Sequence, residues 1–311
     1  MSNAGQPDSR SSRPGRPGRP RALRAPRDTT AKHAVLAAMR AALEGAGLDV
    51  EHLAEQRRKG RAEIESALAR FRAASDQRAQ ALTRDLGRSA QNWLETHRVR
   101  SALAPAAGYY SVSTADLISV SPGVDLQAEH IGPWANTAEV TFSGQTDDVD
   151  QFDGRVTFSF SWPNPTGNDV VCTVTGLLGV AASADVTADG YWWPLDVTPP
   201  ASEIEAFAEL GLRVVDPDGE VTVPPYQDSQ LQEVVSLVVH GEWSEGTIAG
   251  QDIVRGYVLQ YEGVFLPAAA RLEADLTCEI YWLASEGGGQ FIAADNGRQL
   301  SGFGLFIETQ A

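Results

Sequence analysis

Apolar and polar residues alternate one by one along much of the chain after residue 105. The alternation is clearest in VTFSFSW at 156–162 and LEADLTCEIYW at 272–282. It is typical of half-buried β-strands, because successive side chains point to opposite faces of a sheet. The pattern predicts an antiparallel, jelly-roll-like β-sandwich over 105–311, crossed by a short helix at 201–210. Turn sequences separate the runs at 163–169 (PNPTGND), 188–190 (ADG), 216–219 (DPDG), 286–289 (EGGG) and 294–297 (ADNG).

A second period, with apolar residues every three or four positions, governs residues 29–104. This spacing indicates helix, and over 50–97 it is close to the heptad of a coiled coil. We therefore predict a helical hairpin or coiled-coil stalk at 29–104 and a homo-oligomer formed through 50–97. Polar residues and glycine interrupt the stripe, which leaves open a merely amphipathic helix in a two-helix hairpin. The stripe consists of Val50, Leu53, Arg57, Gly60, Ile64, Leu68, Phe71, Ser75, Arg78, Leu82, Leu86 and Trp93.

Residues 1–28 contain seven Arg and five Pro and almost nothing to bury. Such a composition predicts a disordered basic tail. The stretch RPGRPGRPR at 13–21 resembles an AT-hook, a minor-groove DNA-binding element, although proline stands where the hook has arginine. Nucleic-acid binding is expected at most weakly, through the tail at 10–27. The predicted fold class is α+β by segment: a long N-terminal helical hairpin or coiled coil, then an antiparallel β-sandwich.

Charge is divided very unevenly between these segments. Residues 1–100 hold 20 Lys and Arg against 11 Asp and Glu, whereas residues 101–311 hold 5 against 30. The acidic sandwich domain should therefore repel nucleic acid and anionic lipid. The sequence shows neither a signal-peptide apolar region nor a run long enough for a transmembrane helix. We expect a protein that is cytoplasmic as synthesised; release by lysis and signal-independent export stay open.

The two cysteines, Cys172 and Cys278, fall on the apolar side of their alternating runs. Both should therefore point into the sandwich core. Two interpretations follow: free core thiols, or a disulfide that joins the two sheets. Neither favours nucleophilic catalysis, because an apolar environment disfavours the thiolate.

The acidic sequence DDVDQFDG at 147–154 loosely resembles a calcium-binding loop. Calcium prefers several carboxylates that converge from alternate positions. Asp148 and Asp150 fit that spacing, but Asp153 comes one residue late, so an acidic hairpin turn is the alternative. Ca²⁺ is thus the one cofactor that the sequence suggests, and otherwise none is expected.

Aromatic residues give the better indication of a binding surface. Tyr191, Trp192 and Trp193 are consecutive in GYWWPLD, and neighbours on a strand cannot both enter one core. A second candidate surface combines Trp162 with Asn164 and Asp169, since an aromatic ring beside amide and carboxylate groups suits a sugar. The alternation also offers Trp162 a place in the core.

No nucleophile motif, phosphate-binding loop or dinucleotide fingerprint occurs in the sequence. We therefore expect a non-enzymatic structural or binding protein, which oligomerises through its stalk and presents the sandwich to a protein or glycan partner. One alternative is a pore-forming or membrane-remodelling protein that uses the long helices. A second alternative is a carbohydrate-binding or glycoside-acting sandwich protein.

Overall fold

The computed structural model describes residues 108–190, 200–242 and 246–310, together with isolated residues between 41 and 95. The chain divides into two compact units, Met1–Val50 and Glu51–Ala311. All the described strands belong to the second unit. The tail 1–28 and the aromatic stretch 191–199 lie outside the described residues.

The prediction of an α+β fold with a long helical hairpin or coiled coil is wrong. The described residues are nearly all in β-strands, and among them only isolated residues between 41 and 95 and the short 3₁₀ helix η2 (Asp228–Gln230) are helical. The pattern misled because a coiled coil needs apolar seam residues, whereas Arg57, Gly60 and Arg78 occupy seam positions. The rest of 29–104 lies outside the described residues, and the domain boundaries remain a prediction.

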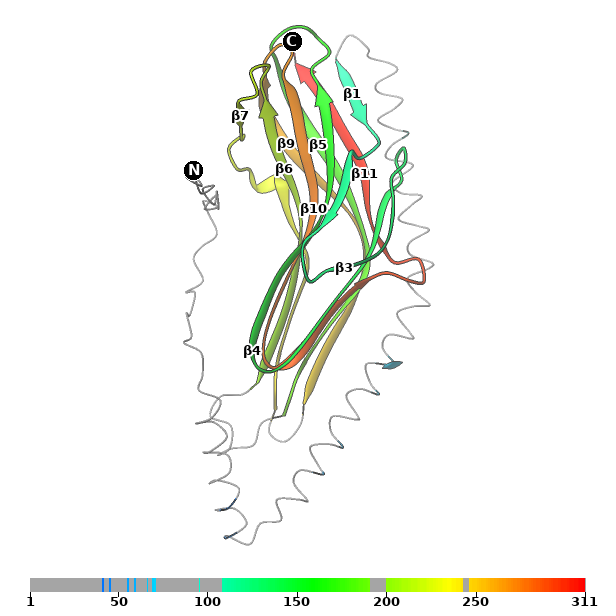
Figure 1. Cartoon of the computed structure of the whole chain (residues 1–311), viewed down its shortest axis with the longest axis vertical. Coiled ribbons are helices and arrows are strands. Elements are labelled where there is room, and N and C mark those ends of the chain that lie inside the picture. The colour runs from blue at the N-terminus through cyan, green and yellow to red at the C-terminus, as the bar shows by residue number, and fades with distance from the viewer. Residues whose placement is uncertain are drawn as a thin grey trace, which may run out of the picture. The chain divides into compact units, whose positions relative to one another are not determined.

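Within the described part of the chain, eleven strands form one antiparallel sheet in the order β2-β4-β11-β5-β10-β6-β7, to which β1, β3, β8 and β9 are also paired (Figure 1). The strands are β1 (Tyr109–Val112), β2 (Leu117–Val120), β3 (Asp125–His130), β4 (Asn136–Pro163), β5 (Val170–Ala188), β6 (Ala201–Val215), β7 (Val221–Thr222), β8 (Leu231–His240), β9 (Thr247–Leu266), β10 (Arg271–Ala293) and β11 (Gln299–Gln310).

This sheet is folded over on itself, and β10 crosses the fold. On one side β10 pairs with β4 from end to end. On its other side it pairs with β6 as far as Ser285 and with β5 from Gly287 onward. Figure 1 shows β4 and β10 turning back at the lower end of the sheet. The EGGG sequence at 286–289, expected to be a turn, is therefore a bend within one strand.

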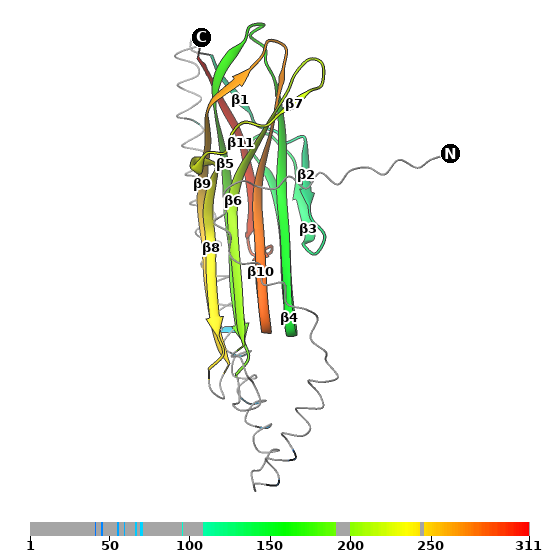
Figure 2. The same ribbon diagram turned by 90° about the vertical axis from the view of Figure 1, so that its left-hand side faces the viewer.

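Folding the sheet produces two layers. The first contains β2, the second half of β4, the first half of β10, β6 and β8, which stand side by side in Figure 2. The second contains β1, β3, β5, β9, β11 and the other halves of β4 and β10. Rings of the two layers meet at both ends of the shared core: Tyr110 with Trp162 at 5.0 Å, and Phe142 with Trp282 at 5.9 Å. The predicted β-sandwich is thus confirmed.

The helix expected at 201–210 is wrong, because this segment is the first part of β6. Alternate residues Ser202, Ile204 and Ala206 are buried, which is the period of a strand. The segment is rich in alanine and glutamate, both good helix formers, but pairing with β10 and β8 on its two sides overrides that propensity.

Three of the other expected turns do connect strands. The sequences at 163–169, 216–219 and 294–297 lie between β4 and β5, β6 and β7, and β10 and β11.

The N-terminal part of the domain is fixed by Asn136, a fully buried residue at the start of β4. Its Oδ1 accepts a hydrogen bond from the Ala115 amide (2.9 Å), and its Nδ2 donates to the carbonyls of Ser113 (2.9 Å) and Gly302 (2.8 Å).

Candidate functional site

A strained tryptophan marks the outer face of the second layer. Trp134, just before β4, has a φ of 60°, a conformation that is a genuine outlier for a bulky residue. Its amide donates to the carbonyl of Ser113 (2.8 Å), which holds the backbone in place. The indole ring stacks on Phe306 of β11, with centroids 5.3 Å apart and planes 17° apart. Both rings are half-buried.

Glycine at position 304 lets the two aromatic rings come together. Gly304 has a φ of +118°, which side chains rarely adopt, and a Cβ there would lie 3.1 Å from the Trp134 ring. The β11 backbone can therefore pass directly beneath the indole. We call the pair of Trp134 and Phe306 the aromatic platform.

Polar side chains lie in register beside the platform. Phe306 pairs with Ser111 on one side and with Thr175 on the other, and Thr175 pairs with Gln260. One row further along β11, Glu308 accepts a hydrogen bond from the Tyr109 hydroxyl (2.9 Å). The outer face therefore combines flat rings with hydroxyl, amide and carboxylate groups.

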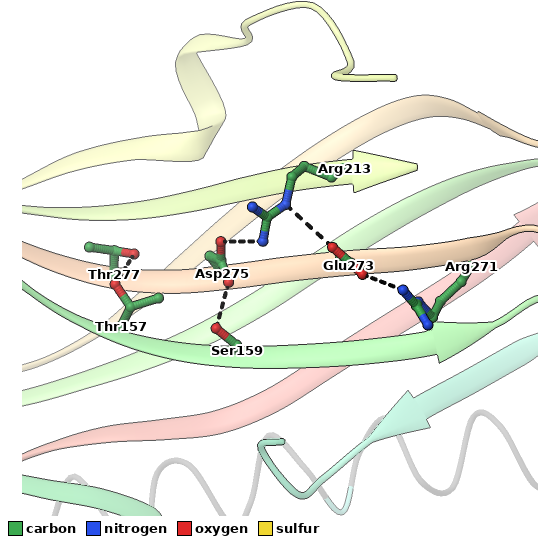
Figure 3. A network of polar contacts seen from close by, with 7 residues as sticks. All are labelled: Thr157, Ser159, Arg213, Arg271, Glu273, Asp275 and Thr277. Carbon is green, nitrogen blue, oxygen red and sulfur yellow. Dashed lines mark hydrogen bonds and ion pairs between the residues drawn. The ribbon is translucent and has the colours of Figure 1, made fainter. Parts of the chain in front are cut away.

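The outer face of the first layer carries a polar network instead (Figure 3). Arg213 of β6 bridges Glu273 (3.5 Å) and Asp275 (3.1 Å) of β10, and Ser159 of β4 donates to Asp275 (2.7 Å). A second arginine, Arg271, lies 2.6 Å from Glu273.

This network has the character of strand-to-strand support. Each carboxylate already has an arginine partner, and the Arg213 and Arg271 side chains are about half exposed, at 48% and 53%. Exposed ion pairs of this kind contribute about 0–1 kcal/mol each. These contacts connect β10 to β4 and β6. Because their polar groups already have partners, the aromatic platform is the stronger candidate for a binding site.

The sequence-predicted site at Trp162, Asn164 and Asp169 is built into the fold. Trp162 and Asn164 are only 6% and 7% exposed. The Asn164 amide donates to the carbonyls of Asn168 (2.8 Å) and Pro267 (3.0 Å), and the Asp169 carboxylate accepts from the Ala268 amide (2.8 Å). These groups close the β4–β5 turn against the β9–β10 turn. Tyr191, Trp192 and Trp193 lie outside the described residues, so their role remains a prediction.

The calcium-like sequence at 147–154 is part of the long strand β4, not a loop. Asp150 and Asp153 are three positions apart on a strand, so their side chains project to opposite faces. Asp150 Oδ1 accepts a hydrogen bond from the Gln151 amide (2.8 Å). The side chain of Asp148 lies outside the described residues. Within the part of the chain that the structure describes, no three His, Cys, Asp or Glu residues group as a metal site would require.

Both cysteines are buried, free thiols, with Cys172 on β5 and Cys278 on β10. Burial raises the pKa of Cys172 to about 11. Burial and the neighbouring Glu279 raise the pKa of Cys278 to about 12. Both thiols therefore stay protonated at neutral pH, which makes them poor nucleophiles.

We expect the raised cysteine pKa values to make the protein lose stability at alkaline pH. The unfolded chain ionises near pH 9 and the folded chain does not, so the stabilisation is complete below about pH 9 and declines toward pH 11–12. At 1.36 kcal/mol per pKa unit, Cys172 should account for about 3 kcal/mol and Cys278 for about 4 kcal/mol. Urea unfolding at pH 7–11 should show a shallower decline in the double variant Cys172→Ala/Cys278→Ala. An unchanged decline would contradict the assignment.

No family model and no curated protein matches this chain. Among solved structures, the carbohydrate-binding module TmCBM61 in complex with β-1,4-galactotriose is 13% identical, over 57% of this chain and 90% of that one, with a TM-score of 0.18. The CBM22-1 xylan-binding domain of Paenibacillus barcinonensis Xyn10C is 13% identical over 60% and 94% (TM-score 0.18). Tailspike protein 4 of bacteriophage CBA120 is 11% identical over 65% and 19% (TM-score 0.19). Likenesses at these TM-scores carry no argument about function.

Sequence reasoning missed the aromatic platform. A positive φ at Trp134 cannot be read from its sequence context, IGPWA. The signal for Phe306 was present, because it lies between the inward-pointing Leu305 and Ile307 and so had to face outward.

Within the described residues, no helix has the length and apolar character needed to cross a membrane. The predicted cytoplasmic location stays a prediction.

Proposed function

We propose that this β-sandwich is a non-catalytic carbohydrate-binding domain and that the aromatic platform is its binding face. The observation that carries the proposal is the strained backbone of Trp134. A sparsely populated backbone conformation costs about 1–3 kcal/mol. It persists only where the surrounding structure enforces it, and such residues cluster at functional sites. At position 134 the strain places an indole ring on the outside of the sheet, stacked on a second ring.

The chemistry of the platform suits a sugar. A pyranose presents one apolar C–H face and a rim of hydroxyl groups, and an indole ring offers the matching flat surface. The neighbouring Thr175 and Gln260 can donate to and accept from those hydroxyls, and the Glu308 carboxylate can accept from them. A ring surface fixed before binding also loses little conformational entropy when the ligand arrives.

The described residues favour binding over reaction. The two thiols are buried and protonated, and the carboxylates of Glu273 and Asp275 are engaged by arginine. The pore-forming alternative depended on long helices, and the described residues supply no support for it. We therefore retain the glycan partner that the sequence suggested, but we propose that it binds at the aromatic platform and not at the surfaces expected from the sequence.

We expect Trp134→Ala to weaken polysaccharide binding by about tenfold or more, as loss of a stacking aromatic anchor does. Affinity gel electrophoresis of the full chain in xylan, galactan and dextran measures this directly. Trp134→Phe should retain most of the binding because it keeps a ring. Tyr226→Ala, which removes an aromatic side chain that is 50% exposed elsewhere, is the matched control.

Thermal unfolding of the same variants separates lost binding from lost folding. The proposal is wrong if Trp134→Ala migrates as the parent protein does in every gel that retards the parent. It is equally wrong if none of the three polysaccharides retards the parent protein.

A further inference from the structure

Strand β9 has one edge that no described strand occupies. On one side β9 pairs with β5 from Thr247 to Leu266, and this is its only strand pairing among the described residues. A strand edge presents a row of backbone donors and acceptors that can template another strand, and proteins ordinarily protect such edges.

Side chains take the place of a neighbouring strand on this edge. The side-chain amide of Gln227 donates to the backbone carbonyl of Glu262 (2.8 Å) and accepts from the backbone amide of Glu262 (2.9 Å). Ser229 donates to the carbonyl of Gln260 (2.8 Å), and Gln232 donates to the carbonyl of Val258 (2.7 Å). We call Gln227, Ser229 and Gln232 the guard side chains.

The spacing of these contacts matches strand pairing. The three carbonyls belong to residues 258, 260 and 262, and in an antiparallel ladder every second residue directs its backbone groups to the same side. The double contact of Gln227 with one residue reproduces the exchange of two hydrogen bonds in a paired strand. The guard side chains thus satisfy the same backbone groups of β9 that an added strand would satisfy.

The stretch of chain that leads to the guard side chains is exposed to solvent. Three large apolar side chains in it are at least half exposed: Val221 at 53%, Val223 at 67% and Tyr226 at 50%. Side-chain hydrogen bonds of this kind contribute only about 0.5–1.5 kcal/mol each. Side-chain contacts of this strength can give way to a partner that offers the same bonds from its backbone.

We propose that the edge of β9 at residues 258–262 is a strand-addition site for an extended, basic peptide segment of a partner protein, and that the guard side chains cover it until the partner binds. Adding a strand to an exposed sheet edge is a recurrent mode of peptide recognition, in which the main chain supplies affinity and alternate side chains supply specificity.

The surroundings of the edge define the chemistry of this peptide. Leu259 and Tyr261 point into the core, so every second residue of the added strand should be apolar. Glu262 belongs to the edge, and Asp228 and Glu233 are sequence neighbours of the guard residues. Residues 101–311 carry 30 Asp and Glu against 5 Lys and Arg. The remaining positions of the peptide should therefore be basic, and the same charge opposes edge-to-edge pairing of two copies.

The test uses the full chain and three synthetic peptides of about ten residues, the length of a long strand. The first alternates valine and lysine, the second alternates valine and glutamate, and the third is the valine–lysine peptide with proline replacing alternate valines. We expect only the first to bind. Removing the guard by Gln227→Ala/Ser229→Ala/Gln232→Ala should tighten its binding about tenfold or more, since four competing bonds are lost.

Two measurements locate the effect. Hydrogen exchange of the backbone amides at 258–262 should slow when the valine–lysine peptide binds. Gln127→Ala is the matched control variant, because the exposed Gln127 side chain contacts the Thr141 side chain (3.4 Å) and no strand edge. The single variant Gln232→Ala serves as a second test should the triple variant unfold.

Three outcomes would overturn the proposal. Equal binding of the proline peptide would show charge attraction without strand addition. If the guard variants bind the valine–lysine peptide no more tightly than the parent protein does, the guard side chains do not compete for the edge of β9. Self-association of the guard variant in sedimentation, without peptide binding, would show that the edge takes a second copy instead. None of these outcomes bears on the aromatic platform.

Discussion

Replacing Gly287 with alanine is expected to destabilise the fold by about 3 kcal/mol or more, as overpacking against rigid backbone does. Gly287 lies at the bend of β10, and a Cβ there would come within 2.2 Å of the Thr187 carbonyl oxygen. That oxygen belongs to β5, whose pairing with β10 begins at this position, so it cannot move without breaking the ladder.

The surroundings of the bend leave little room for adjustment. Ser202 donates to the carbonyl of Gly288 (2.9 Å), and the buried Trp282 lies 3.3 Å from the Ser202 hydroxyl through its Nε1. Both contacts fix the bend against the start of β6. Alanine at Gly287 must therefore displace one layer relative to the other.

Urea unfolding followed by tryptophan fluorescence measures this effect. Gly211→Ala in β6 is the matched control, because the nearest atoms to its added Cβ are 3.9 Å away, an ordinary contact distance. It should be neutral or slightly stabilising, since alanine restricts the unfolded chain more than glycine does. Similar unfolding midpoints for the two variants would contradict a tightly packed bend.

Replacing Asn136 with alanine is expected to cost about 4 kcal/mol, because buried groups that lose their partner cost about 1–3 kcal/mol each. The Ala115 amide and the carbonyls of Ser113 and Gly302 would all lose a hydrogen bond. Ser113 also accepts from the Trp134 amide, so the change should loosen the aromatic platform as well.

Asn168→Ala is the control for this prediction. The Asn168 side chain is exposed and makes a long contact of 3.4 Å with the carbonyl of Thr166, so its loss should cost less than about 1 kcal/mol. Thermal unfolding compares the two, and equal losses would show that burial of Asn136 carries no special weight.

The alternation of apolar and polar residues was sufficient to locate the sandwich. It placed Trp162, Cys172 and Cys278 on inward faces, where the structure has them buried. It did not predict that one sheet would supply both layers. The buried positions of β10 shift by one residue at a β-bulge between Ser285 and Gly287, where its partner changes from β6 to β5, and the sequence gives no sign of that change of partner. A short-range pattern carries no information about which strand lies alongside.

Both errors began from local patterns. The helix expected at 201–210 was inferred from local composition, which pairing with β10 and β8 overrides. The stalk expected at 29–104 was inferred from spacing alone, although polar residues interrupt its stripe. Trp134 escaped notice for the opposite reason, since its conformation is imposed by contacts with Ser113 and Phe306 that are distant in sequence. The site predicted at Asn164 and Asp169 contained the right residue types, but the turn uses all their polar groups.

The folded-over sheet has a consequence for how the chain reaches its native state. Because β4 and β10 each contribute to both layers, neither layer can be completed while the other is unformed. The closing contact between Tyr109 and Glu308 joins residues 199 positions apart. Chains dominated by such distant pairings fold slowly, in milliseconds to seconds, and expose strand edges meanwhile. Both layers therefore depend on the β4–β10 pair, which spans the fold.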